Sequence, residues 1–131
     1  MTQENGYTVG AADTRPWGTW RVIDVGDGFA VKRITVVPGG KLSLQRHKFR
    51  SEHWILVSGH ARVRIGDEER DLFANQSVFI PVQALHRMEN VGETELAFVE
   101  VQFGEILDEA DIERIEDVYG RDTGGSNTVG G

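Results

Sequence analysis

The feature that most limits what this chain can fold into is a series of short segments in which apolar and polar residues alternate. In "HARVRIG" (residues 60–66), Ala61, Val63 and Ile65 alternate with two arginines, which is the period of two of a half-buried β-strand. Glycine, asparagine and aspartate separate such segments in stretches like "VGDGF", "VPGG" and "ENVGETE". About eight strands at this spacing predict an all-β barrel or sandwich of the jelly-roll kind.

The length of the chain and its two ends predict a single domain. A chain of 131 residues can bury one core but is short for two. Residues 122–131 are rich in glycine and have almost nothing to bury, so we expect a disordered tail. Residues 1–13 are expected to be flexible, with an added edge strand as the alternative. The folded domain is therefore predicted over residues 14–121.

Charge and composition exclude several classes of function. The formal net charge of −7 argues against a binder of nucleic acid or of membrane surfaces, because both are anionic. No apolar run approaches the ~20 residues that span a bilayer, and no signal peptide is recognisable, so we expect a cytoplasmic protein. The chain has no cysteine, so any metal ion must be held by nitrogen and oxygen atoms.

The pattern changes near the C-terminus, in "EILDEADIERIEDVYG" (residues 105–120). Ile112, Ile115 and Tyr119 are spaced like one face of a helix, and Asp108 could cap its start. We therefore expect a short C-terminal helical segment that packs on the outside of the barrel.

Four polar residues in the middle of the chain form a candidate metal site. Gln45 and His47 are two apart and share a strand face, whereas Glu52 follows His47 by an odd number of residues. The chain must therefore turn between them for all three to meet. A second histidine, His86, opens a later strand in "IPVQALHRMEN". Two imidazoles, a carboxylate and an amide oxygen suit Mn²⁺, Fe²⁺, Co²⁺, Ni²⁺ or Zn²⁺.

These residues stand at the spacing of the two sequence motifs of the cupin family, which the chain resembles. The first motif falls on Gly39, Gln45, His47, Glu52 and Gly59, and the second on Asn75, Pro81, Gln83, His86 and Asn90. Gln45 replaces the first histidine of the family pattern, and Asn75 and Gln83 replace glycines at turns. The resemblance implies the cupin double-stranded β-helix, a jelly-roll barrel.

A closer resemblance is to the C-terminal isomerase domain of type II phosphomannose isomerases. It runs from about Arg15 to Arg121 and is carried by "RPWGTW", "LSLQ", "EHW", "IPVQALHR", "EVQFG" and "DIERIEDVYGR". The family commonly has histidines at the positions of Lys48 and Phe49, and glycine-glutamate-aspartate-aspartate in place of "DEAD" (residues 108–111). Larger members also carry an N-terminal nucleotidyltransferase domain that this sequence lacks, so GDP-mannose synthesis is not carried over.

The resemblance implies an activity and a role for each candidate residue. The expected reaction converts mannose 6-phosphate to fructose 6-phosphate in a homodimer with one divalent metal ion per chain. The metal ligands would be Gln45, His47, Glu52 and His86, and the proton carrier Glu100 or His53. The substrate would be bound by Arg50, Arg114, Arg121, Lys32 (or Arg33), Trp54 and Gln102.

Simpler structural interpretations remain open for these residues. The four metal-ligand candidates could form a buried hydrogen-bonded cluster, although that would be costly without a metal ion. His53 could be a surface histidine, Trp54 a plain core residue, and each cation a surface charge. Glu100 and Gln102 contribute to the site only if their strand face lies inside the barrel. The alternative functions are a sugar-binding cupin without turnover and, with iron bound, a dioxygenase.

Overall fold

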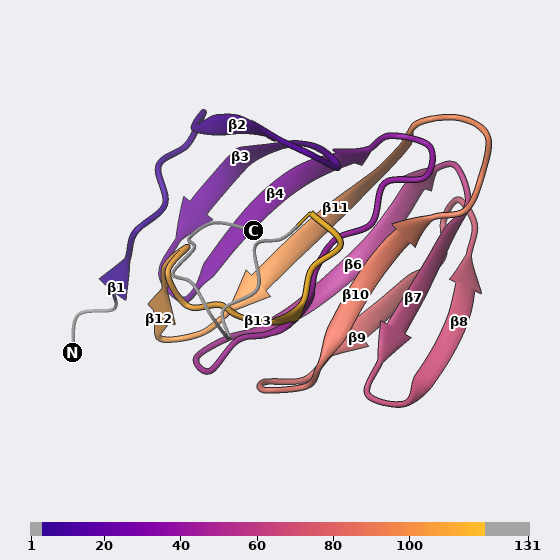
Figure 1. Ribbon diagram of the computed structural model, residues 1–131. Coiled ribbons are helices and arrows are strands. Elements are labelled where there is room, and N and C mark those ends of the chain that lie inside the picture. The colour runs from indigo at the N-terminus through magenta and orange to yellow at the C-terminus, as the bar shows by residue number, and fades with distance from the viewer. Residues whose placement is uncertain (1–3, 120–131) are drawn as a thin grey trace.

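Thirteen short strands, and no helix, make up the regular structure of residues 4–119, which the computed structural model describes (Figure 1). The all-β prediction is confirmed. One sheet has six strands in the order β2 (Ala12–Arg15), β3 (Gly18–Gly26), β4 (Phe29–Val36), β11 (Leu96–Phe103), β6 (Ser51–Ser58) and β9 (Ser77–Ile80). The other has five, in the order β13 (Glu113–Glu116), β5 (Leu44–Arg46), β10 (His86–Asn90), β7 (Ala61–Ile65) and β8 (Glu68–Leu72).

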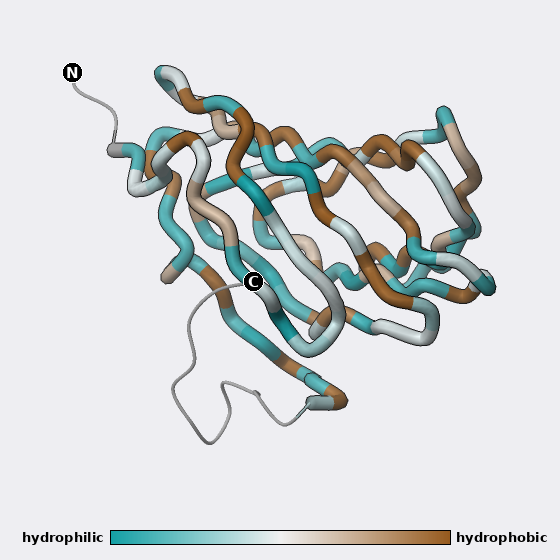
Figure 2. Tube along the Cα trace, turned by 90° about the horizontal axis from the view of Figure 1, so that it is seen from above, coloured by the Kyte–Doolittle hydropathy of each residue, from teal (hydrophilic) through white to brown (hydrophobic). Residues whose placement is uncertain are grey.

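The two sheets face each other, and their inward side chains form the core. Along β6, Trp54 and Leu56 are buried whereas Ile55 and Val57, which alternate with them, are exposed, as the period of two requires. The Trp54 ring contacts that of Phe98 on the neighbouring strand β11, with ring centroids 5.3 Å apart. Figure 2 shows the same alternation as brown and teal segments along the strands. Full burial of such a side chain stabilises the fold by about 1.5–3 kcal/mol.

The N-terminal segment contributes strands to the fold. β1 (Glu4–Asn5) pairs in parallel with β12 (Ile106–Leu107), and β2 forms the edge of the six-stranded sheet. The Tyr7 side chain between them is buried in the core. An edge strand, the alternative considered for this region, is therefore present. The flexibility of residues 1–13 stays a prediction, and residues 122–131 and Arg121 lie outside the described residues.

The expected C-terminal helix is not formed, and this prediction is wrong. β13 instead pairs antiparallel with β5, where Glu113 lies opposite Arg46 and the two side chains form a 2.7 Å ion pair. The Asp111 carboxylate accepts the backbone N–H groups of Lys48 and Phe49. Strand pairing satisfies backbone groups along the edge of β5 that a helix on the outside would leave open. Ile115 remains largely exposed.

Two exposed turns hold residues in the left-handed backbone region. Asn75 has φ 74° and Gln83 has φ 69°, and these are the two positions at which the second cupin motif has glycine. The backbone N–H of Gln83 donates to the carbonyl oxygen of His47 (2.9 Å), so the turn at Gln83 helps to fix the backbone of a candidate metal ligand. The left-handed conformation is strained for a residue with a Cβ atom.

Replacing Gln83 by glycine should therefore stabilise the protein. We expect the free energy of unfolding to rise by about 1 kcal/mol, because glycine adopts positive φ without the Cβ clash. Urea unfolding of the metal-free protein measures the change. Ala74→Gly, an exposed position without positive φ, is the control and should lower the same free energy. An equal loss in both variants would contradict the interpretation.

The outer face of the six-stranded sheet carries several exposed apolar side chains, namely Ile55, Val57, Phe79 and Phe103. The homodimer stays a prediction. Within residues 4–119, no helix is long and apolar enough to cross a membrane.

Candidate metal centre

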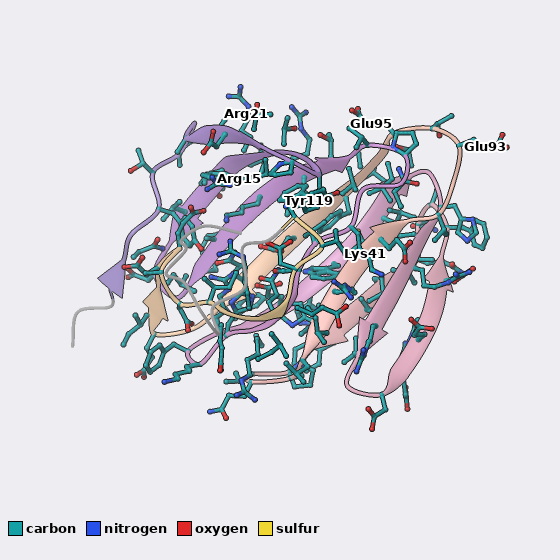
Figure 3. All side chains as sticks on the ribbon, viewed as in Figure 1. Arg15, Arg21, Lys41, Glu93, Glu95 and Tyr119 are labelled. Atoms are coloured by element: carbon teal, nitrogen blue, oxygen red, sulfur yellow. The ribbon has the colours of Figure 1, made fainter. Side chains whose placement is uncertain are left out.

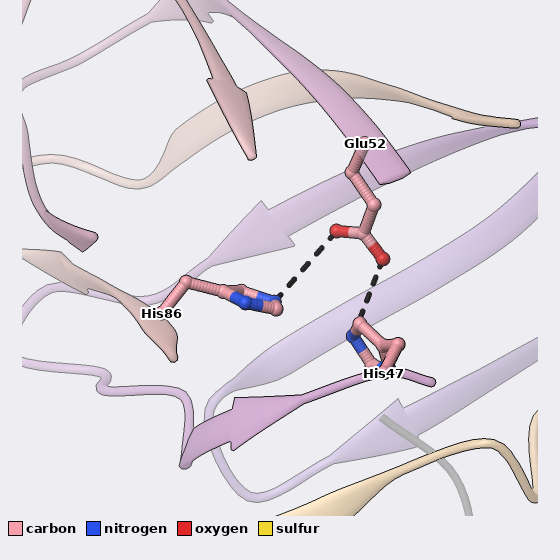
Figure 4. A group of neighbouring side chains, drawn as sticks. All are labelled: His47, Glu52 and His86. Carbon is pink, nitrogen blue, oxygen red and sulfur yellow. Dashed lines mark ion pairs between the residues drawn. The ribbon is translucent and has the colours of Figure 1, made fainter. Parts of the chain in front are cut away.

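Three side chains from separate elements converge inside the barrel. His47 follows β5, Glu52 lies on β6 and His86 begins β10, and their donor atoms all lie within 4.8 Å of one another (Figure 4). All three are buried. The turn at residues 48–50 separates β5 from β6 and brings Glu52 back beside His47, as the spacing requires. His86 is brought to the same place because it pairs with Gln45 across the sheet.

Backbone carbonyls fix the protonation of both imidazoles. His47 Nδ1 lies 2.6 Å from the Asp111 carbonyl oxygen, and His86 Nδ1 lies 2.9 Å from that of Ala84. Because a carbonyl oxygen only accepts, each Nδ1 carries the hydrogen and each Nε2 presents a lone pair. Burial lowers the pKa of both histidines, so both are neutral near pH 7. This is the form in which histidine binds a metal ion.

The Glu52 carboxylate is ionised and faces both lone pairs. Its Oε2 lies 3.3 Å from His47 Nε2, and its Oε1 lies 3.9 Å from His86 Nε2, the contacts dashed in Figure 4. Burial alone would raise the pKa of Glu52, but the nearby Arg50 guanidinium, together with His47 and His86, holds this pKa well below its usual range. Three buried acceptors therefore point at one another, an arrangement that a cation stabilises.

Two further side chains hold Glu52 in place. Arg50 Nε donates to Glu52 Oε2 (2.8 Å) and Trp54 Nε1 donates to Glu52 Oε1 (2.8 Å). Arg50 also approaches His47 Nε2 at 3.2 Å with Nη2 and donates from Nη1 to the Tyr7 hydroxyl at 3.0 Å. Arg50 thus partly balances the negative charge. The residues fit a divalent metal ion, because two neutral imidazoles and one carboxylate are the donors of many such sites.

Gln45 lies in the same cavity but differs from the other three candidates. Its amide nitrogen donates to the Ser43 hydroxyl (3.0 Å) and carbonyl (3.3 Å), so its carbonyl oxygen is the atom available to a metal ion. The cavity has a volume of about 30 Å³ and is also lined by Trp17, Trp20 and Trp54. It has room for a metal ion and a water molecule but not for a hexose phosphate.

Glu100 on β11 is a second buried carboxyl group in this cavity. Gln102 is buried beside it and donates from Nε2 to Glu100 Oε2 at 2.6 Å. The polar face of β11 therefore lies inside the barrel. Burial, followed by the negative charge of Glu52, raises the pKa of Glu100 to about 7. A carboxyl group with this pKa can accept and return a proton near neutral pH.

The structure does not bring every predicted residue to the cavity. His53 is exposed on the outer face of β6, where its ring lies 4.7 Å from that of Phe79 and 5.9 Å from that of Phe103. Arg114 is buried on β13 opposite Gln45 but does not line the cavity, and Arg33 is exposed on β4. Lys32 does line the cavity.

Sequence reasoning missed two residues that contact side chains of the cavity lining. The Tyr7 hydroxyl accepts from Arg50, and the Glu109 carboxylate accepts from Lys32 Nζ at 2.9 Å. Neither residue lies in a motif with regular spacing. The only signal for Glu109 was the glutamate that "DEAD" shares with the resembled family.

Two antiparallel sheets that enclose two imidazoles and a carboxylate define the class of protein, which is a cupin. Solved structures superimpose on the chain at low sequence identity, so they show the fold alone. The cupin domain of Cnp3 from Schizosaccharomyces pombe has a TM-score of 0.66 and 11% identity over 76% of this chain and 73% of its own. An oxalate decarboxylase from Lactobacillus farciminis has a TM-score of 0.70 and 23% identity over 80% of this chain and 33% of its own. The polysaccharide-assembling protein CapF from Staphylococcus aureus has a TM-score of 0.68 and 23% identity over 82% and 34%.

Within the cupins, this chain belongs to the family of mannose-6-phosphate isomerase C-terminal domains, whose model matches residues 3–117. Similar proteins include the alginate biosynthesis protein AlgA of Pseudomonas aeruginosa (53% identity over 82% of this chain). The xanthan biosynthesis protein XanB of Xanthomonas campestris is 55% identical over 82%, and the mannose-1-phosphate guanylyltransferase ManC of Salmonella typhimurium is 50% identical over 82%. The chain spans 22–23% of the length of these relatives.

The relatives correct the function expected from the sequence. Interconversion of mannose 6-phosphate and fructose 6-phosphate is wrong as a description of the whole function. The similar proteins are named for alginate and xanthan biosynthesis and for guanylyl transfer, and this chain matches less than a quarter of each. The matched domain is therefore one part of such proteins, and the residues of its site indicate the chemistry of the domain itself.

Proposed function

We propose that this domain contributes a metal-assisted proton transfer on a phosphorylated sugar, chemistry of the aldose–ketose isomerase type. The observation that carries the proposal is the position of Glu100, a buried carboxyl group in the same cavity as His47, Glu52 and His86. The family description supports a mannose phosphate as the class of substrate. The longer relatives support a domain that works beside another activity, such as the guanylyl transfer named for ManC.

His47, Glu52 and His86 would hold one divalent ion, with the Gln45 amide oxygen as a weaker fourth donor. Mn²⁺, Fe²⁺, Co²⁺, Ni²⁺ and Zn²⁺ all accept nitrogen and carboxylate ligands. When bound, such an ion would stabilise the negative charge that develops on the sugar oxygens.

The residues of the chain account for the proton. In its ionised form, the Glu100 carboxylate accepts a proton from the carbon beside the carbonyl and returns it to the former carbonyl carbon, so the carboxylate is regenerated in each turnover. The hydroxyl proton of the carbon beside the carbonyl passes to the former carbonyl oxygen, which balances the isomerisation. The Gln102 amide holds Glu100 Oε2 and orients the carboxylate. The tryptophans of the cavity lining exclude water, which keeps the proton from exchanging freely.

The rate should rise with pH, with a midpoint at or below about 7, because a bound divalent ion would offset the Glu52 charge that helps to raise the pKa of Glu100. The pKa of Glu100 is raised to about 7 from an ordinary value of 4.5, so the group is protonated and inactive as a base below that range. The measurement is kcat/KM for ketose formation from hexose 6-phosphates between about pH 5.5 and 8.5. Metal content, determined at each pH, is the control for loss of the ion. A rate that stays constant down to pH 5.5 at full metal content would contradict this role of Glu100.

A further inference from the structure

Lys32 lines the metal cavity, and its ammonium group is buried. Its side chain is 6% exposed, and Nζ lies 4.6 Å from the ring centroids of both Tyr7 and Trp20. Lys32 is directly opposite Glu100 in the β4–β11 pairing, and both are buried. Directly opposite residues have Cβ atoms about 4.5–5.5 Å apart. The Lys32 and Glu100 side chains therefore leave the sheet on the same inner face, and both line the cavity.

The Glu109 carboxylate joins Lys32 to a second cation. Glu109 Oε1 accepts from Lys32 Nζ at 2.9 Å, and Glu109 Oε2 lies 4.0 Å from Arg15 Nη2. Arg15 Nη1 lies 3.1 Å from Asp13, whereas Arg15 Nε is buried and has no hydrogen-bond partner among residues 4–119. In Figure 3, Arg15 lies over the six-stranded sheet, whereas Arg21 of neighbouring β3 reaches beyond it.

We propose that Lys32 and Arg15 form the subsite for the phosphate group of the substrate, and that Glu109 occupies this subsite in the empty protein. The inference rests on the proposed function and adds the place where the anionic end of the substrate binds. A phosphate monoester carries about −1.5 to −2 charges at pH 7 and three acceptor oxygens, so it can replace one carboxylate between two cations. It also offers an acceptor to the unpartnered Arg15 Nε.

The size of the cavity supports an exchange between Glu109 and the substrate. A volume of about 30 Å³ is too small for a whole hexose phosphate, so part of the substrate would lie outside the cavity, and Glu109 is not among the residues that line it. Glu109 is 26% exposed on the loop between β12 and β13. Its side chain can turn to solvent while the backbone hydrogen bond from Asp111 to Asp108 (3.1 Å) stays intact.

The other cations fit this role less well. Arg50 is buried and bonded to Glu52, so a phosphate there would meet the carboxylate of a candidate metal ligand. Arg114 does not line the cavity. Lys32 and Arg15 differ because their shared carboxylate belongs to a partly exposed loop, and a phosphate that replaces it would keep the buried Lys32 ammonium paired.

Glu109→Gln tests the subsite directly, because it keeps the shape of the side chain and removes its charge. We expect the variant to bind inorganic phosphate about five- to tenfold more tightly than the wild type in calorimetry of the metal-loaded protein. Lys32→Met should abolish most of this binding. The matched control is Glu113→Gln, which breaks a 2.7 Å ion pair with Arg46 outside the cavity and should bind like the wild type.

The proposal is overturned if Glu109→Gln binds phosphate no more tightly than Glu113→Gln. It is also overturned if Lys32→Met leaves phosphate binding intact and only removal of the metal abolishes it, because phosphate would then be bound by the ion. Thermal unfolding of each variant establishes that it is folded.

Phosphate binding needs no turnover, which separates this inference from the proposed function. Glu100→Gln, expected to be inactive, should bind phosphate as the wild type does. Glu109→Gln should likewise lower the dissociation constant of mannose 6-phosphate but leave that of mannose unchanged. If the protein turns over substrate but neither Lys32→Met nor Glu109→Gln changes phosphate binding, the subsite alone is rejected. Phosphate binding as expected without turnover would reject the proposed reaction alone.

Discussion

Replacing His86 by alanine is expected to lower the affinity of the protein for a divalent metal ion by more than about 100-fold, since even the partners of metal ligands are worth about 10- to 100-fold. His86 supplies one of the three donor atoms that converge within 4.8 Å, and its Nε2 lone pair is fixed by the hydrogen bond from Nδ1 to Ala84. Titration of the metal-free protein with Co²⁺ or Zn²⁺ measures the effect.

His53→Ala is the matched control for this experiment. It removes the same type of side chain from the outer face of β6, away from the cavity, and should leave metal affinity unchanged. Equal affinities of the two variants would mean that the metal, if bound at all, is bound elsewhere. The free energy of unfolding of both metal-free variants shows whether a loss of affinity reflects a loss of the fold.

Replacing Glu100 by glutamine should lower the rate of proton transfer by about 10²- to 10⁴-fold, the usual contribution of a general base. Glutamine keeps the size of the side chain but cannot accept the proton from carbon. Metal content and phosphate binding should remain those of the wild type, because Glu100 is not one of the three converging donors.

The control for Glu100→Gln is Glu105→Gln, which removes a carboxylate from an exposed position after β11. Its rate should equal that of the wild type. A Glu100→Gln protein that retains more than about a tenth of the wild-type rate would assign the base to another residue.

Much of the fold could be predicted from local patterns in the sequence. The alternation in "HARVRIG" gave β7 because side chains in a strand point to opposite faces, and the odd spacing from His47 to Glu52 required the turn that the structure contains. The same alternation explains why His53, adjacent to buried Glu52, faces outward. A residue next to a buried strand position is a poor candidate for the same site.

The errors lie where pairing partners far apart in the sequence decide the structure. Ile112, Ile115 and Tyr119 have a helical spacing, but the open edge of β5 offers hydrogen bonds to Glu113–Glu116 that local spacing does not reveal. Lys32 and Glu109 meet across 77 residues of chain, and Arg50 meets Tyr7 across 43. Such contacts depend on how the barrel closes, so the convergence of cations could not be predicted from the sequence.

The measurement that tests the central claim most directly is incorporation of deuterium from D₂O into the carbon-bound positions of mannose 6-phosphate. The metal-loaded and the chelator-treated wild-type proteins are compared by nuclear magnetic resonance. We predict deuterium at the carbon beside the carbonyl only with the metal-loaded protein, because the proton held by Glu100 exchanges with solvent in part of the turnovers. If folded, fully metal-loaded protein gives no deuterium incorporation and no ketose formation, the assignment of proton-transfer chemistry to this domain is contradicted.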